Sequence, residues 1–223
     1  MTIREAHLTV QRTARYASLG PAGPAAAEAW FVCHGYGQRA AAFLEAFLPL
    51  DDGRRLVVAP EALSRFYLDS GPSGRHGEQV GASWMTREDR ECEIDDYVRY
   101  LEALRSQVLA PIGRSDVAVR VLGFSQGVAT AARWVLRAAW KPDQLILWGG
   151  LLPPELIPEE GTPFPEVRLT FVSGERDPAV DQVRLAQQVA ALRSRGARVE
   201  QVSFAGAHRL DTPTLLRLAG ADE

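Results

Sequence analysis

Short apolar runs alternate with amphipathic stretches along most of the chain. Six runs stand out, at residues 29–33, 55–59, 117–123, 144–149, 167–174 and 198–204. They are rich in Val, Leu and Ile, and continuous runs of this length are typical of strands that are covered on both faces, as in a parallel sheet. We therefore expect them to form one mostly parallel sheet.

Helix-spaced apolar residues fill several intervals between these runs. One stripe extends from Ile94 to Val108 at spacings of 4, 3, 3 and 4, and a second begins at Val183 and ends before Gly196, a suitable residue just beyond a helix end. A third helix is expected to begin at Thr212 as N-cap, with Pro213 at its first position. Strands that alternate with helices predict an α/β fold with helices on both faces of the sheet. No repeat or linker interrupts the pattern, so we expect a single domain over residues 1–223.

Three segments depart from this alternation. Residues 6–18 alternate only partly and predict one or two early antiparallel strands. Residues 63–84 are rich in Gly and Ser, and residues 149–166 contain five prolines. Both follow a predicted strand, and ligands in open α/β sheets bind beyond the carboxyl ends of the strands. We therefore expect these two segments to be loops that form pocket walls.

The third apolar run leads into a Gly-Phe-Ser-Gln-Gly turn. Gly123 and Gly127 lie two residues either side of Ser125, between a predicted strand and a predicted helix. A strand-to-helix turn this sharp strains the serine backbone and leaves no room for side chains at the two glycine positions. It also projects the hydroxyl at the amino end of a helix, where the dipole favours developing negative charge. Ser125 is our candidate nucleophile, although the motif alone also fits a plain turn.

A nucleophilic serine needs a base, and the base needs an acid that orients it. His208 is the one histidine that follows Ser125, and it lies between the last apolar run and the last predicted helix. Asp177, a few residues after the preceding strand, is our candidate acid. Its rivals are Glu175, which is too close to the strand, and two aspartates expected to open helices, Asp181 and Asp211.

A His-Gly-Tyr-Gly turn after the first apolar run is the candidate oxyanion loop. Its glycines allow the backbone to approach a substrate closely. The expected donors are the backbone N–H groups of Tyr36 and Gln126, the latter being the residue after the nucleophile. We expect His34 to brace the turn and to take no part in the chemistry.

Composition narrows the remaining choices. The 223 residues carry a net charge of −3, which gives no electrostatic reason to expect a nucleic-acid partner. No apolar stretch approaches the length of a membrane span, and the charged N-terminus does not resemble an export signal, so we expect a cytoplasmic protein. Cys33 and Cys92 do not form a metal-ligand spacing, and Cys33 is expected to be a buried free thiol. The motifs of metal hydrolases are absent from the sequence, so no metal is expected.

These motifs together resemble the α/β-hydrolase superfamily, and within it the phospholipase/carboxylesterase branch that includes acyl-protein thioesterases. The likeness rests on "HGYGQ" at 34–38, "PEA" at 60–62, "GFSQG" at 123–127, "GGLLP" at 149–153, "GERDPAV" at 174–180 and "GAH" at 206–208. It implies an α/β-hydrolase fold without a large lid domain and a serine esterase that needs no cofactor. The chain departs from the branch at Gln38, where an acidic residue is common.

The substrate is expected to be a small-molecule carboxylic ester with a small or medium acyl group. Tyr36, Trp84, Leu151 and Leu152 are the candidate pocket residues. A thioester or a lysophospholipid would suit the same triad, and a non-catalytic ligand-binding protein of this fold is the alternative from another class. Apolar positions near the prolines of 153–165 would suit the contact surface of a homodimer or a lid.

Overall fold

The computed structural model describes residues 2–69, 77–157 and 161–220. A seven-stranded sheet forms its centre, in the order β1-β3-β2-β6-β7-β8-β9. The six predicted strands all occur, and every neighbouring pair among them is parallel. Their bounds are β2 Glu28–Cys33, β3 Arg55–Pro60, β6 Ala118–Phe124, β7 Gln144–Trp148, β8 Arg168–Gly174 and β9 Arg198–Phe204.

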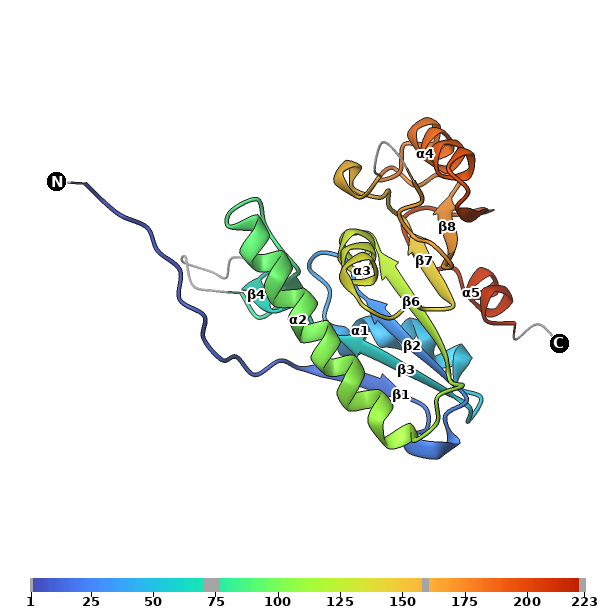
Figure 1. Cartoon of the computed structure of the whole chain (residues 1–223), viewed down its shortest axis with the longest axis horizontal. Helices are drawn as coiled ribbons and strands as arrows, with labels where there is room; N and C mark the ends of the chain where they lie inside the picture. The colour runs from blue at the N-terminus through green and yellow to red at the C-terminus, as the bar shows by residue number, and fades with distance from the viewer. Residues whose placement is uncertain (1, 70–76, 158–160, 221–223) are drawn as a thin grey trace.

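The early strand prediction holds only for its last residues. β1 (Tyr16–Leu19) pairs antiparallel with β3, and Tyr16 lies opposite Pro60 at the end of that strand. No strand of the described part of the chain pairs with residues 2–15, so their partial alternation does not lead to pairing. The apolar side chains of Ile3 and Leu8 remain exposed, and the segment extends away from the sheet in Figure 1.

Helices cover both faces of the sheet, as predicted. Alternate strand residues point to opposite faces: Phe31 packs in the same apolar cluster as α2, α3 and α4, whereas Trp30 packs with α1 and α5. Figure 1 shows α2 and α3 crossing in front of the strands. The bounds are α1 Ala40–Leu44, α2 Arg90–Leu109, α3 Gln126–Arg137, α4 Gln182–Ser194 and α5 Thr212–Ala219, with short 3-10 helices η1 Gly23–Ala25, η2 Glu45–Leu50, η4 Ala110–Ile112 and η5 Pro154–Leu156.

Two details of the helix predictions are wrong. In α4 the buried stripe is Leu185, Val189 and Leu192, whereas Val183 is 67% exposed. Val183 and Leu185 are two residues apart and therefore point to opposite sides of a helix, so only one of them reaches the core. The N-cap of α5 is Asp211 and not Thr212, because the Asp211 carboxylate accepts the Thr214 N–H.

The segment predicted as one loop over 63–84 contains a small second sheet. β4 (Ser64–Tyr67) and β5 (Val80–Ser83) pair antiparallel, with Ser64 opposite Ser83. The part of this loop at 70–76, and residues 158–160 of the other predicted loop, lie outside the described residues. None of the described helices is both long enough and apolar enough to span a bilayer.

Candidate active site

Ser125 occupies the sharp turn between β6 and α3. Its backbone has φ +54° and ψ −116°, a conformation that costs a non-glycine residue of order 1–3 kcal/mol. The flanking glycines are required by crowding: a Cβ at Gly123 would lie 2.2 Å from the Gly127 oxygen, and one at Gly127 would lie 2.2 Å from the Cys33 oxygen. The strain is held in place by the Ser125 N–H, which donates to the Trp148 oxygen at 2.8 Å.

His34 braces the neighbouring loop as predicted. The imidazole is fully buried, and its Nε2 accepts the Ala62 N–H at 3.1 Å. Because that position must accept, the proton sits on Nδ1, which donates to the Gly35 oxygen at 2.7 Å. Burial lowers the pKa of His34, an effect that the bond to Gly35 and the charge of Glu61 partly oppose. A neutral His34 therefore fixes the turn.

This loop lies directly against the serine. A Cβ placed on Gly35 would be 3.2 Å from Ser125 Cβ, closer than most such contacts, so glycine favours the approach. The Gly35 N–H donates to Gln38 Oε1 at 2.8 Å, and the Gly37 N–H donates to the Ala82 oxygen at 2.9 Å. Among the described residues, none accepts a hydrogen bond from the backbone N–H of Tyr36 or Gln126. Both candidate oxyanion donors are thus free to bind a ligand.

Asp177 and His208 come together from the ends of β8 and β9. His208 Nδ1 lies 2.8 Å from Asp177 Oδ2 and 3.0 Å from Oδ1. The Asp177 side chain is 1% exposed and that of His208 is 28% exposed, which leaves one edge of the imidazole accessible. Asp177 Oδ1 also accepts the Ala179 N–H at 2.8 Å, which fixes the carboxylate.

Phe124 links this pair to the serine. The Phe124 ring packs on the His208 ring with centroids 4.9 Å apart, and Ser125 is the next residue along the chain. No hydrogen bond between Ser125 Oγ and His208 is present among the described residues. A serine activated by His208 requires that contact; in ligand-free sites such bonds are often long and tighten when substrate binds.

The residues of this arrangement fall within one long match to a protein family. The model of the Phospholipase/Carboxylesterase family matches residues 20–219. The chain belongs to this family. No curated protein sequence matches it.

Solved structures of several esterases and of a thioesterase share the fold. Zea mays acyl-protein thioesterase 2 is 19% identical, with a TM-score of 0.68 over 93% of this chain and 97% of that one. A carboxylesterase from Mesorhizobium loti is 17% identical, with a TM-score of 0.69 over 94% and 95%. A phospholipase/carboxylesterase from Dyadobacter fermentans is 20% identical, with a TM-score of 0.65 over 94% and 97%. At these identities the likeness establishes the α/β-hydrolase fold.

The candidate pocket residues divide into two groups. Tyr36 is 62% exposed and its ring packs on Phe66 at 5.1 Å, and Leu151 is half-buried. Trp84 and Leu152 are each 2% exposed and belong to the core. The Trp84 Nε1–H donates to the His34 oxygen at 2.8 Å. The buried indole therefore helps to fix the backbone of the oxyanion loop.

The Gln126 side chain has a role that the sequence analysis missed. Its amide donates to Ser83 Oγ and to the Met85 oxygen, both at 3.0 Å, and accepts the Trp84 N–H at 3.2 Å. These bonds tie the first residue of α3 to the end of β5. Nothing in the local sequence predicts them, because the two segments are over 40 positions apart.

A hollow of about 310 Å³ opens beside His208 and was also missed. We call it the His208 hollow. Its walls come from α1 and η2, from Gln38 just before α1, and from Phe124, His208 and the residues that follow His208. Its lining consists of Gln38, Ala42, Phe43, Ala46, Phe124, His208, Arg209 and Leu210.

Proposed function

We propose that this family member is a serine hydrolase that cleaves carboxylic esters with small or medium acyl groups. The observation that carries the proposal is the Asp177–His208 pair, which packs through Phe124 against a serine held in a strained turn. Strained backbone at a candidate nucleophile is expected where geometry is maintained for chemistry. The reaction needs no cofactor.

In this mechanism, Ser125 Oγ attacks the ester carbonyl while His208 Nε2 takes its proton. Asp177 holds the imidazole with Nδ1 protonated and stabilises the imidazolium that forms. The Tyr36 and Gln126 N–H groups donate to the oxyanion, and the loss of one such donor typically lowers turnover by about 10²–10³. His208 then protonates the leaving alcohol, and water hydrolyses the acyl-enzyme by the same proton route.

Labelling with a fluorophosphonate probe tests the nucleophile. We expect the intact protein to gain one phosphonyl group, which peptide mass spectrometry locates on Ser125. The Ser125→Ala variant should neither be labelled nor hydrolyse 4-nitrophenyl butyrate, because no other group is expected to attack. A Ser125→Ala protein that keeps its full esterase activity would overturn the proposal.

A further inference from the structure

Apart from His208, whose Nε2 accepts a proton in the mechanism above, the polar side chains that line the His208 hollow are those of Gln38 and Arg209, and both carry hydrogen-bond donors. Gln38 Oε1 is occupied by the Gly35 N–H at 2.8 Å. This bond fixes the orientation of the amide, because an N–H group requires the oxygen opposite it. The Gln38 NH₂ group therefore lies on the other side of the amide, and no described residue accepts a hydrogen bond from it.

Arg209 is one of the residues that line the same hollow. Its side chain is 56% exposed, with Nη2 3.2 Å from Asp211 Oδ1 and Nη1 donating to the Leu210 oxygen at 3.3 Å. The guanidinium carbon also lies 5.7 Å from the centre of the Phe204 ring. These contacts position the guanidinium and leave several of its five N–H groups available.

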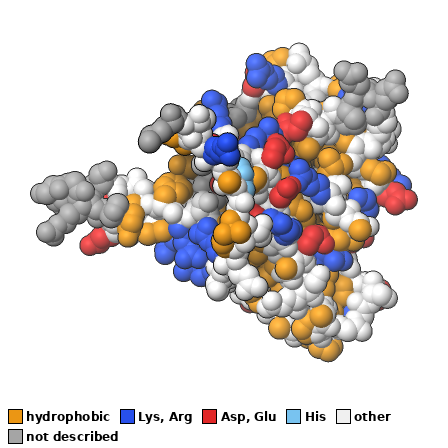
Figure 2. Space-filling model, turned by 60° about the vertical axis from the view of Figure 1, so that its left-hand side comes forward, with side chains coloured by type: hydrophobic (Ala, Val, Ile, Leu, Met, Phe, Trp, Pro, Cys, Tyr) orange, Lys and Arg blue, Asp and Glu red, His pale blue; other side chains and the backbone are white. Residues whose placement is uncertain are grey.

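Arg209 and Asp211 form an ion pair, so their two charges sum to zero. Asp211 Oδ2 is taken by the hydroxyl of Thr214 at 2.8 Å, where the residue caps α5. Acidic and basic side chains are interspersed on the face that Figure 2 shows. Recognition of an anion at this site therefore depends on the local donors and not on a broad positive field.

The position of the hollow indicates which part of an ester enters it. His208 lines the hollow, whereas Ser125 and Gln126 do not. In the mechanism above, His208 protonates the leaving oxygen, so the alcohol portion of the ester lies on the His208 side of the bond that breaks. A volume of about 310 Å³ is at the lower end of the range for ligand pockets.

We propose that the His208 hollow binds a carboxylate carried by the alcohol portion of the substrate, with Gln38 and Arg209 as specificity-determining residues. The proposal rests on the serine hydrolase function above. The carboxylate accepts from the Gln38 amide and the Arg209 guanidinium, and the carbon skeleton contacts Ala42, Phe43 and Leu210. Charge-assisted hydrogen bonds of this type are about twice as strong as neutral ones.

Two butyrate esters with matched leaving groups test this assignment. One is the ester of 4-hydroxybenzoate, which is anionic, and the other is the ester of 4-hydroxybenzamide, which is neutral and has nearly the same shape. Each kcat/KM is divided by the rate of hydroxide hydrolysis of the same ester. We expect the wild type to favour the anionic ester by about tenfold, mainly through KM, as the loss of one charged hydrogen bond predicts.

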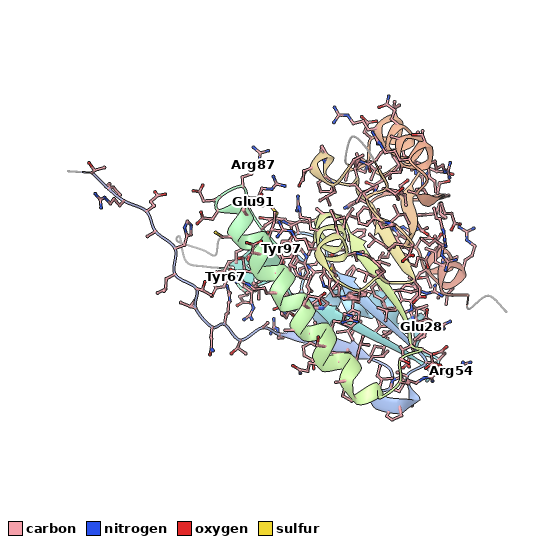
Figure 3. The ribbon with its side chains drawn as sticks, in the orientation of Figure 1. Glu28, Arg54, Tyr67, Arg87, Glu91 and Tyr97 are labelled. Carbon is pink, nitrogen blue, oxygen red and sulfur yellow. The ribbon has the colours of Figure 1, made fainter. Side chains whose placement is uncertain are left out.

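The variants separate charge from packing. Arg209→Gln should abolish most of the preference, and Arg209→Lys should retain part of it. Gln38→Glu keeps an oxygen for the Gly35 N–H but replaces the amide donors with a charged acceptor, so it should reverse the preference. Arg54→Gln is the matched control for net charge, because Arg54 directly precedes β3 at the amino ends of the parallel strands, whereas the hollow lies beyond their carboxyl ends. Figure 3 shows Arg54 at the opposite end of the sheet from Tyr67, the last residue of β4.

Three outcomes would overturn the inference. They are equal wild-type efficiency on the two esters, an unchanged preference in both Arg209→Gln and Gln38→Glu, and a stronger preference for an acyl-side carboxylate. The last is measured with 4-nitrophenyl hemisuccinate against 4-nitrophenyl pentanoate. Failure of the proposed function is distinguishable, since it would show as absent fluorophosphonate labelling. Calorimetric binding of 4-hydroxybenzoate to Ser125→Ala tests the hollow without any turnover.

Discussion

At the scale of single residues, two histidines illustrate opposite uses of the same side chain. His208 keeps part of its imidazole accessible beside Asp177, whereas His34 is fully buried between the Gly35 oxygen and the Ala62 N–H. Protonation of His34 would place a hydrogen on Nε2 facing another N–H group. The oxyanion loop therefore depends on a histidine that stays neutral.

This arrangement predicts a pH dependence of stability. Burial lowers the pKa of His34 from its ordinary value of 6.5, so the unfolded chain takes up a proton before the folded chain does. The stability contributed by neutral His34 is fully present above that value, and is lost as pH falls through the lowered folded pKa. Urea denaturation between pH 8 and pH 5 should show a shallower decline in His34→Gln than in the wild type.

At pH 8 the same variant should be less stable by about 1–3 kcal/mol, because buried hydrogen bonds are disturbed. Because the two proteins differ only at residue 34, the comparison of slopes isolates the contribution of His34. Identical slopes for the two proteins would contradict the role given to His34.

At the scale of elements, the α3 helix and the β4–β5 sheet are joined through one side chain. Gln126 bonds Ser83, Trp84 and Met85, and its backbone N–H is a proposed oxyanion donor. The Gly37 N–H of the oxyanion loop donates to the Ala82 oxygen in β5. β5 therefore positions both halves of the proposed oxyanion hole.

We expect Gln126→Ala to lower kcat while retaining the backbone donor. The variant leaves the Trp84 N–H without a partner, which costs about 1–3 kcal/mol, and leaves the Met85 oxygen with the Ser83 hydroxyl as its one remaining side-chain donor among the described residues. Gln144→Ala is a matched control, since Gln144 is 3% exposed and donates to Thr170 Oγ1 at 2.8 Å where β7 begins. Equal losses of kcat in the two variants would indicate general loosening and not a positioning role.

The elements that the sequence predicted are those with a local signal. β2, β3, β6, β7 and β8 are largely apolar runs, whereas β9 at the sheet edge mixes apolar residues with Arg198, Glu200 and Gln201. The Asp181 cap and the Gly196 end of α4 are visible in neighbouring residues. β4 and β5 were missed because their pairing joins short segments across a Gly-rich interval. The partial alternation over 6–15 gave a false strand signal, because whether a partner strand lies alongside is a property of the tertiary structure.

The residues of the site likewise divide into those with a local signal in the sequence and those without one. Ser125, Asp177 and His208 could be chosen from chain order, residue type and position relative to predicted strands. The sequence did not reveal that Trp84 is buried, nor that Gln38 and Arg209 face one hollow. Those facts depend on how loops from separate strands pack against one another.

At the scale of the whole molecule, a charged cluster holds together the end of the sheet opposite the site. Glu28 pairs with Arg55 at 2.9 Å and with Arg120 at 2.5 Å, and all three side chains are largely buried. Arg55 also donates to the Ala219 oxygen at 2.8 Å, and Arg120 donates to the Leu218 oxygen. The cluster therefore joins β2, β3 and β6 to the end of α5.

Glu28→Gln should destabilise the fold without changing the chemistry. Removal of one partner from a largely buried ion cluster costs about 3 kcal/mol, whereas Glu200→Gln on the exposed side of β9 should change the stability by less than about 0.5 kcal/mol. Urea midpoints of the two variants measure the changes in stability. The kcat of folded Glu28→Gln at 25 °C checks that the chemistry is unchanged. A fall in kcat for Glu28→Gln at full occupancy of the folded state would mean that the two ends of the sheet are coupled.

The position of His208 between β9 and α5 has a consequence for biosynthesis. Ser125 and the oxyanion loop leave the ribosome long before the proposed base, which follows the last strand of the sheet. A nascent chain can thus fold around Ser125 while the base that activates this serine is still missing. Ser125 then cannot yet be acylated by a substrate. On the mechanism proposed above, the enzyme becomes reactive only once residue 208 has emerged and the final strand has paired, so catalytic competence reports completion of the sheet.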